Sequence, residues 1–291
     1  MKFVSVIIPT RNRAAFLEKV FPTYLSQKSL GELIIINDGS TDGTGKLIYQ
    51  LAKKDERIKY IENIKSVGAP ASRNLGVHKA LFELIYYGED DLYLKDNTLS
   101  TLINHMDNSN ADAISGRRIW IARGETESIA FARAAKMKGK LVNVDLMTTN
   151  CEILTSDDVE SELLDASMLI KKYVFTKVQY DPYYKNNAWR EETDFQISCR
   201  EKGFKLVFCP HVATFHLPKL KDKGGNHMSN SIQYELNIFK NDHYFISKHK
   251  VYLKYTLGLN LFKHYFLFIL NRLFMKNAIP LIVTSKKKIF P

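Results

Sequence analysis

Two short acidic clusters are the part of this chain whose residue types and spacing could do chemistry. The first, Glu89-Asp90-Asp91, directly follows an apolar run, 84–87. Three adjacent carboxylates repel one another unless a cation joins them, and their hard oxygen atoms suit Mg²⁺ or Mn²⁺. The second, Glu191-Glu192-Thr193-Asp194, opens a stretch of helical pattern, where negative charge is favourable. A metal that holds a diphosphate and a separate carboxylate that deprotonates a hydroxyl are what transfer from a nucleotide-activated donor requires.

The elements that must position these clusters follow a regular alternation. Apolar, β-rich runs are typical of buried parallel strands and alternate with stretches of helical spacing. The predicted strands are 3–8, 33–36, 58–61 and 85–87, and the predicted helices are 14–27, 43–53 and 69–84. This order predicts an α/β fold with a mostly parallel central sheet that helices flank on both faces. In such sheets ligands bind beyond the carboxyl ends of the strands, where the polar motifs fall.

The pattern is weaker after the first acidic cluster. Residues 117–162 have no clean period, and we expect a long loop that covers a substrate. A turn rich in Tyr and Asn, 180–189, ends at Trp189 and leads to the second cluster. A short strand, 205–208, precedes Pro210, and His216 follows six residues later.

Charge divides the chain into two parts. The net charge is +11, but residues 217–291 hold 13 Lys and Arg against 3 Asp and Glu, so residues 1–216 are nearly neutral. A nucleic-acid-binding protein would carry its basic residues on the folded face, so we expect no nucleic-acid partner. The tail mixes basic residues with aromatic ones, and its apolar runs are too short to span a membrane. It is predicted to be helical and to lie on an anionic membrane, to pack on the rest of the chain or to form a subunit interface.

The cysteines favour a reduced compartment. Cys151, Cys199 and Cys209 form no CxxC pair and have no zinc-type spacing with histidine, so they are predicted to be small core residues. The apolar run 3–8 is too short for a signal peptide. We therefore expect a cytoplasmic protein at the inner face of the membrane.

Several motifs allow more than one interpretation. The Gly-rich stretch 39–46 is not a P-loop, because five residues separate Gly39 from Gly45 and Leu47 replaces the required Ser or Thr. Asp38, at a strand end, either caps the next helix or accepts from a base or ribose. Arg73 makes either a surface ion pair or a contact with the donor. His216 is either an ordinary buried histidine or a ligand of a metal or diphosphate.

A set of weak motifs in a fixed order resembles one known family. The motifs are SVIIPTRNR (5–13), IINDGSTD (35–42), ASRNLG (71–76), the acidic triplet 89–91, REETDF (190–195) and a downstream His216. Together they resemble the family 2 inverting glycosyltransferases of the GT-A fold, over residues 3–216. The resemblance implies a catalytic domain at 1–216, with a nucleotide-sugar-binding part at 1–116 and an acceptor-side part at 117–216. Residues 217–291 then form a basic, aromatic-rich helical tail.

The resemblance also implies roles for individual residues. The residues implied around the donor nucleotide are Pro9, Thr10, Arg11, Asn12, Asp38, Gly39 and Arg73, with Glu89 or Asp90 towards the ribose. Asp91 is implied as a ligand of Mn²⁺ or Mg²⁺, with His216 on the metal or diphosphate. Glu192 matches the catalytic base, with Glu191 as the alternative. The implied acceptor-side residues are Asp165, Trp189 and Asp194. Two departures stand out: Glu occupies both position 89 and the base position, where the family usually has Asp.

The implied partners are a nucleoside-diphosphate sugar and a glycan or lipid-linked saccharide as acceptor. Two other classes of function share part of the pattern. A sugar nucleotidyltransferase would carry a Gly-rich loop after its first strand, and residues 9–13 contain no glycine. A catalytically dead protein that binds membranes or polyanions would fit the basic tail, but intact acidic clusters favour an enzyme.

Overall fold

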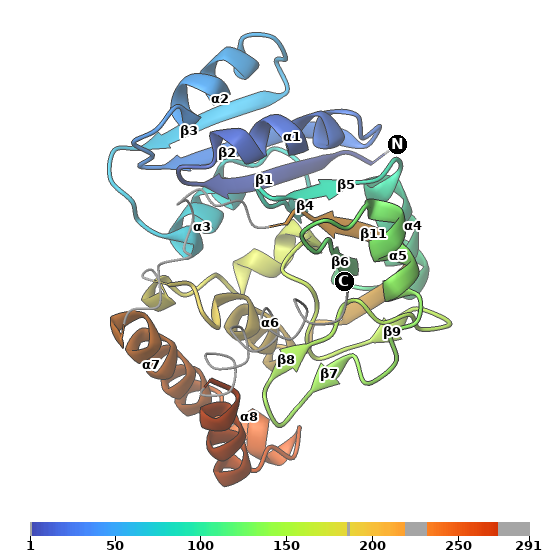
Figure 1. Cartoon of the computed structure of the whole chain (residues 1–291), viewed down its shortest axis with the longest axis vertical. Coiled ribbons are helices and arrows are strands. Elements are labelled where there is room, and N and C mark those ends of the chain that lie inside the picture. The colour runs from blue at the N-terminus through green and yellow to red at the C-terminus, as the bar shows by residue number, and fades with distance from the viewer. Residues whose placement is uncertain (1, 185–186, 219–231, 273–291) are drawn as a thin grey trace, which may run out of the picture.

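The computed structural model describes residues 2–184, 187–218 and 232–272. Its centre is a mixed sheet of nine strands in the order β3-β2-β1-β4-β10-β6-β11-β5, with β9 paired to β11 (Figure 1). The strands are β1 (Val4–Thr10), β2 (Leu30–Asp38), β3 (Ile58–Asn63), β4 (Leu84–Tyr87), β5 (Leu92–Leu94), β6 (Ala113–Trp120), β9 (Val159–Glu160), β10 (Met168–Lys171) and β11 (Leu206–His216). A separate hairpin pairs β7 (Val142–Asn143) with β8 (Thr148–Thr149).

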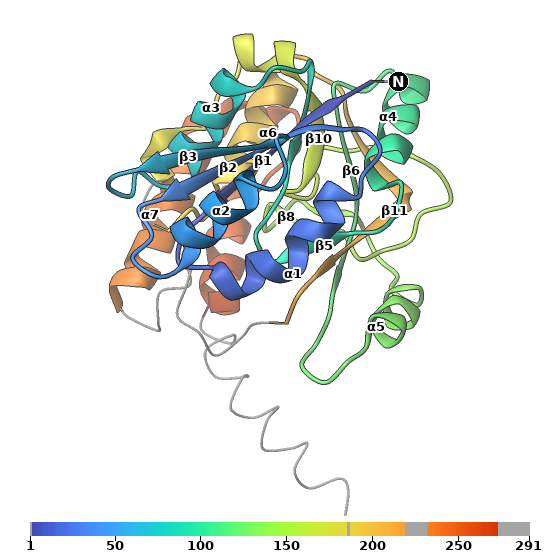
Figure 2. The same ribbon diagram turned by 90° about the horizontal axis from the view of Figure 1, so that it is seen from above.

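Alternating side chains of the parallel strands supply two hydrophobic cores. Ile8 faces the core that includes α1 (Ala14–Leu25), α2 (Thr44–Ala52) and α4 (Thr98–Ser109). Its neighbour Ile7 faces the opposite core, with α3 (Ala69–Lys79) and α6 (Glu191–Glu201). Figure 2 shows α1 and α2 on one side of strands β1 to β3, and α3 and α6 on the other. The predicted α/β class is therefore confirmed, with antiparallel strands in the second half of the sheet.

The antiparallel strands bring distant residues to one edge of the sheet. β10 runs antiparallel between β4 and β6, and β5 pairs antiparallel with the end of β11. In that last pairing His216 lies opposite Leu92, the residue after the acidic triplet. The sheet therefore places the last residue of β11 beside Asp91, although 124 residues separate the two in sequence.

Some predicted boundaries differ from the structure. The helix predicted at 69–84 ends at Lys79, because Ala80 has an extended backbone with ψ 136°. Residues 117–162 are not one long loop: they contain the end of β6, helix α5 (Glu127–Ala134), the β7–β8 hairpin and β9. The strand predicted at 205–208 continues to His216, because a register shift between Phe208 and Ala213 accommodates Pro210.

The described part of the tail packs on the rest of the chain, as Figure 1 shows for α7 (Ile232–Lys248) and α8 (Lys250–Tyr255) beside α6. Phe245, Leu253 and Leu259 share a core with Ile197 of α6. Two short 3-10 turns, η1 (Lys172–Thr176) and η2 (Pro182–Tyr184), precede α6. Within the described ranges, no helix is both long and apolar enough to cross a bilayer. Residues 219–231 and 273–291 of the predicted tail, including Phe274 and Lys276, lie outside the described residues.

A buried ion-pair network joins this tail to the start of α6. Arg190 lies 2.7 Å from Asp242 of α7, and the side chains of both residues are at most 2% exposed. Asp242 also bonds His264 at 3.0 Å. Burial alone would raise the pKa of Asp242, but His264 and Arg190 hold it below its ordinary value. The network therefore fixes the helix that carries the second acidic cluster.

Asp242→Ala should lower the free energy of unfolding by about 3–5 kcal/mol, because it leaves the Arg190 charge buried and unpaired. The control is Asp145→Ala, which removes an exposed partner of Lys263 and should cost about 0–1 kcal/mol. Urea denaturation followed by circular dichroism measures both. Equal losses in the two variants would contradict the role assigned to this network.

Candidate functional site

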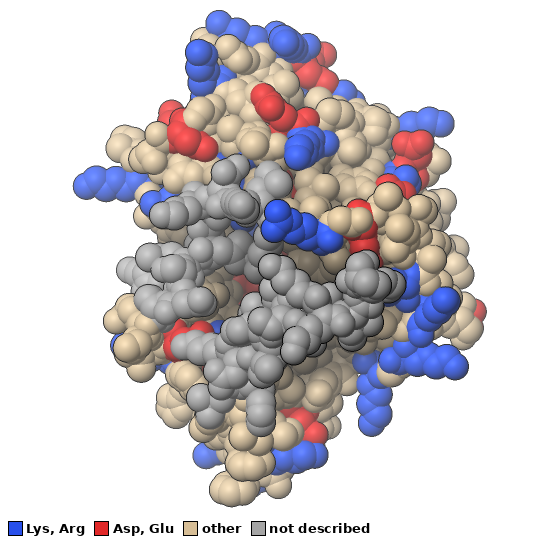
Figure 3. Space-filling view, viewed as in Figure 1, with Lys and Arg blue, Asp and Glu red and all other residues tan. Residues whose placement is uncertain are grey.

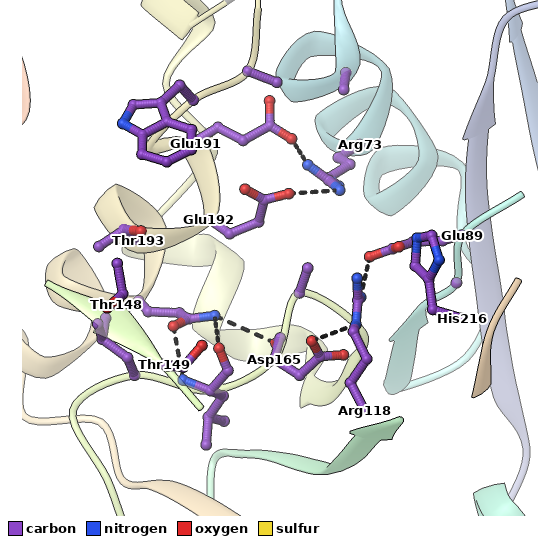
Figure 4. Close-up of a pocket in the computed structure, with 18 of the residues that line it drawn as sticks. Arg73, Glu89, Arg118, Thr148, Thr149, Asp165, Glu191, Glu192, Thr193 and His216 are labelled. Carbon is purple, nitrogen blue, oxygen red and sulfur yellow. Dashed lines mark hydrogen bonds and ion pairs between the residues drawn. The ribbon is translucent and has the colours of Figure 1, made fainter. Parts of the chain in front are cut away.

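Both acidic clusters line one cavity of about 580 Å³ (Figure 4). The cavity lies beyond the carboxyl ends of β1 and β4, where a parallel sheet is expected to bind ligands. Its charged and aromatic lining residues are Arg73, Glu89, Asp90, Asp91, Arg118, Trp120, Asp165, Trp189, Glu191, Glu192 and His216. Figure 3 shows the outer surface of the protein from the direction of Figure 1, with charges of both signs interspersed.

The backbone that precedes the acidic triplet, at the end of β4, is closely packed against neighbouring side chains. A side chain at Gly88 would approach Ile8 and Tyr24 to 2.9 Å, so only glycine fits without movement there. The hydroxyl of Tyr24 accepts from the Glu89 amide at 3.1 Å and lies 3.2 Å from the Glu89 carbonyl. This contact fixes the direction in which the three carboxylates leave the strand.

Each carboxylate of the triplet has a different partner. Glu89 accepts from Arg118, while Asp90 accepts from the Thr10 hydroxyl at 2.8 Å. Arg13 approaches Asp90 at 3.9 Å and Asp91 at 3.7 Å, which are long distances for ion pairs. Burial and the neighbouring Asp91 raise the pKa of Asp90 to about 7. The protein's own cations therefore leave part of the negative charge of the triplet uncompensated.

His216 faces the triplet in a form that suits a metal ligand. Its Nδ1 donates to the Leu217 carbonyl at 2.8 Å, so Nε2 lies towards Asp91 Oδ1 at 3.3 Å. Burial lowers the pKa of His216, although the neighbouring carboxylates oppose this shift. A neutral ring with Nδ1 protonated leaves the Nε2 lone pair free. Trp120 stacks on the ring, with centroids 4.0 Å apart, and fixes its orientation.

These residues fit a divalent cation. Donor atoms of Glu89, Asp91 and His216 lie within 4.8 Å of one another. Two carboxylates and one imidazole form a donor set for Mn²⁺ or Mg²⁺. Burial and the neighbouring Asp91 raise the pKa of Asp90, and a bound cation would offset this repulsion between like charges.

Arg118 is a site residue that the sequence analysis missed. Its Nε lies 2.6 Å from Asp165, and its Nη2 contacts Glu89 (Figure 4). Burial and Glu89 raise the pKa of Asp165 to about 6, although Arg118 opposes the shift. The available signal was the pair Arg117-Arg118 within a stretch, 113–120, that otherwise contains no charged residue. Arg118 therefore connects the triplet to the expected acceptor-side residue Asp165.

On the other wall of the cavity, Arg73 contacts both candidate bases (Figure 4). Its guanidinium bonds Glu191 and lies 3.2 Å from Glu192. The suggestion of a surface ion pair is wrong, because the Arg73 side chain is only 7% exposed. The side chain of Glu191 is 1% exposed and that of Glu192 is 31% exposed. Of these two carboxylates, Glu192 is the one that a substrate can reach.

The residues expected around the nucleotide divide into two groups. Pro9 lines the cavity and Thr10 bonds Asp90. The second group forms a network next to the cavity: Asn12 bonds Ser40 and Thr41, and the Asp38 carboxylate accepts from Asn63, Ser66 and the amides of Val67 and Gly68. Gly39 follows Asp38 with φ 67°, and Arg11 is exposed. In this structure Asp38 thus organises the loop that leads into α3.

The expected acceptor-side residues also differ in position. Asp165 and Trp189 line the cavity. Asp194 faces the C-terminal helices instead, where its fully buried carboxylate bonds Tyr184, Lys248 and His249 at 2.8–3.0 Å. Its contacts are those of a residue that attaches α6 to α7 and α8.

Sequence comparison places the first half of the chain in a known family. The family model described as glycosyl transferase family 2 matches residues 5–148. The Campylobacter jejuni GalNAc(5)-diNAcBac-PP-undecaprenol beta-1,3-glucosyltransferase is 38% identical over 107 residues, 35% of this chain and 34% of that protein. The Staphylococcus aureus poly(ribitol-phosphate) beta-N-acetylglucosaminyltransferase TarP is 26% identical over 270 residues, 89% of this chain and 80% of TarP. GlyG of Streptococcus pneumoniae is 28% identical over 116 residues, 40% of this chain. The chain spans 38% of GlyG, well under two thirds of its length.

Solved structures show the same fold at low identity. GalNAc-T7, crystallised with UDP, GalNAc and Mn²⁺, has a TM-score of 0.65 at 18% identity, covering 87% of this chain and 50% of that chain. Residues 1–349 of Staphylococcus aureus TarS, in complex with UDP-GlcNAc, have a TM-score of 0.60 at 14% identity, covering 90% of this chain and 77% of that chain. The chain therefore belongs, through residues 5–148, to glycosyl transferase family 2, and it has the GT-A fold.

Proposed function

We propose that the protein transfers a sugar, with inversion, from a nucleoside-diphosphate sugar to a hydroxyl group of a glycan or lipid-linked saccharide. One observation carries the proposal: a metal donor set and a solvent-accessible carboxylate line the same cavity. Family membership and the GT-A fold support the reaction class. A nucleotide sugar and Mn²⁺ occur in the solved neighbours TarS and GalNAc-T7, respectively.

The acidic wall of the cavity holds the diphosphate end of the donor. Asp91 and His216 would bind Mn²⁺ or Mg²⁺, with Glu89 close by. When bound, this cation supplies positive charge that stabilises the leaving nucleoside diphosphate. Asp90, held by Thr10, faces the ribose in this arrangement, and Arg118 keeps Glu89 ionised.

The opposite wall supplies the base. Glu192 accepts the proton of the acceptor hydroxyl while Arg73 orients its carboxylate. Glu191, buried against Arg73, holds the guanidinium in position. Because the base and the diphosphate-binding residues lie on different walls, the hydroxyl approaches the anomeric carbon from the side opposite the leaving group. This geometry favours inversion, which is the mechanism that the sequence resemblance also implies.

We also propose that the acceptor is membrane-bound. The relative from Campylobacter jejuni is named for transfer to an undecaprenol-linked saccharide. On the described tail, Val251 and Tyr255 of α8 are 72% and 75% exposed, and Phe262 and Phe266 are 83% and 55% exposed. Each pair is spaced four residues apart and lies on one helical face. Exposed Lys250 and Lys254 directly precede the two members of the first pair. Aromatic and basic residues together fit the interface of an anionic membrane at the cytoplasmic face.

The central test is turnover with a panel of nucleoside-diphosphate sugars in the presence of Mn²⁺. Hydrolysis of one donor, measured as released nucleoside diphosphate, is expected with Mn²⁺ or Mg²⁺ and is expected to stop in excess chelator. Asp91→Asn should abolish turnover and weaken diphosphate binding, because it removes one charged metal ligand. Asp96→Asn, at an exposed position nearby, is the control and should keep full activity. Full activity in excess chelator would refute the role of the metal.

The two glutamates of α6 give a second prediction. Glu192→Gln should lower kcat by about 10²–10⁴, the usual contribution of a general base, and should leave donor affinity unchanged. Glu191→Gln should mainly lower stability, because it removes the buried partner of Arg73. Single-turnover kinetics and thermal unfolding separate the two effects. If Glu191→Gln loses its chemistry while Glu192→Gln stays active, the assigned roles are reversed.

A third prediction concerns the membrane. The full chain should sediment with anionic liposomes at low salt and dissociate at high salt, since each basic residue near such a surface contributes about 1 kcal/mol. The double variant Phe262→Ser and Phe266→Ser should sediment less. The matched control changes two exposed apolar residues elsewhere, Ile64→Ser and Leu81→Ser, which are 96% and 72% exposed. Equal sedimentation of the two double variants would exclude membrane contact through this face.

A further inference from the structure

A second group of potential metal ligands lies outside the cavity described above. It consists of His105 on α4, Asp158 just before β9 and Cys209 in β11. His105 Nδ1 lies 2.8 Å from Asp158 Oδ2. One donor atom from each of the three residues lies within 4.8 Å of the other two. The group therefore brings a nitrogen, an oxygen and a sulfur donor to one point.

The sheet explains why three residues so far apart in sequence meet. β9 pairs antiparallel with β11, and Val159 lies opposite Phe208. The next residue on each side of this pair is Asp158 and Cys209, so the two come close together. The register of β11 shifts between Phe208 and Ala213, which turns this stretch away from regular pairing. Helix α4 packs on β11 and carries His105 to the same place. The His211 ring stacks on His105, with centroids 5.0 Å apart, and restricts its orientation.

One oxygen atom of Asp158 is available to bind a ligand. Asp158 Oδ1 is buried and has no hydrogen-bond partner among the described residues. Such an orphaned buried oxygen is unusual and calls for an explanation. Cys209 is fully buried, whereas the side chains of His105 and Asp158 are 26% and 20% exposed. An ion can thus enter from the side of His105 and Asp158 and reach the sulfur behind them.

We propose that His105, Asp158 and Cys209 bind Zn²⁺, with water in the fourth position. A thiolate, an imidazole and a carboxylate are all zinc ligands, and a thiolate favours Zn²⁺ over Mg²⁺ or Mn²⁺. The ion would bind the Asp158 oxygen that has no hydrogen-bond partner, and it would take the place of the direct contact between His105 and Asp158. The ion would connect α4, the segment before β9 and β11, at a point seven residues before His216 on the same strand. Sequence spacing alone could not reveal it, because each ligand comes from a different element.

Cobalt spectroscopy on the full chain tests this site separately from the acidic triplet. After treatment with chelator, one equivalent of Co²⁺ should produce a thiolate-to-cobalt absorption band in the near ultraviolet, and Zn²⁺ should displace it. The acidic triplet has no sulfur donor and cannot give this band. Zn²⁺ should also raise the midpoint of thermal unfolding, because it binds the folded chain.

Two substitutions in the site and two control substitutions complete the test. Cys209→Ser should abolish the band, and His105→Ala should weaken cobalt binding at least about tenfold. The controls are Cys199→Ser, another buried cysteine, and His78→Ala, an exposed histidine. Both controls should keep the band and the zinc-dependent shift in unfolding. Absence of the band in the unaltered chain, or its loss in Cys199→Ser, would overturn the proposal and leave Asp158 as a hydrogen-bond acceptor for its neighbours.

Discussion

The concentration of negative charge at the end of β4 is the constraint on which the rest of the site depends. Glu89, Asp90 and Asp91 are largely withdrawn from water, where like charges are costly without compensation. The chain supplies only part of the positive charge, through Arg118 and the more distant Arg13. β6 delivers Arg118, and β11 delivers the neutral His216. We propose that a divalent cation supplies the remaining charge and that the strands carrying Arg118 and His216 support its site.

The opposite wall depends on a second buried charge, Arg73. It neutralises Glu191 and leaves Glu192 accessible. The helix that carries both glutamates is fixed from behind by buried polar contacts of Arg190 and Asp194 with α7 and α8. The C-terminal helices are thus part of the support of the candidate base. This arrangement links the acceptor side of the cavity to the exposed aromatic residues that we assign to the membrane.

Features that are local in sequence could be predicted, and features that depend on long-range packing could not. The strand–helix alternation predicted the α/β fold, and both acidic clusters were found as contiguous residues. Arg118 was missed because its role appears only when β6 lies beside Glu89. The pairing of Arg73 with α6 spans more than a hundred residues and has no local signal. The tail pattern fitted either a membrane or a packed helix, since both bury one apolar face, and only the structure shows its described part packed.

The central claim is that the triplet and His216 form a divalent cation site for a nucleoside diphosphate. Crystals grown with Mn²⁺ and a nucleoside diphosphate, measured at a wavelength where manganese scatters anomalously, test it most directly. We expect an anomalous peak within bonding distance of Asp91 and His216 Nε2, with the diphosphate oxygens completing the coordination. A bound diphosphate without a peak at these residues, or with a peak only elsewhere, would contradict it.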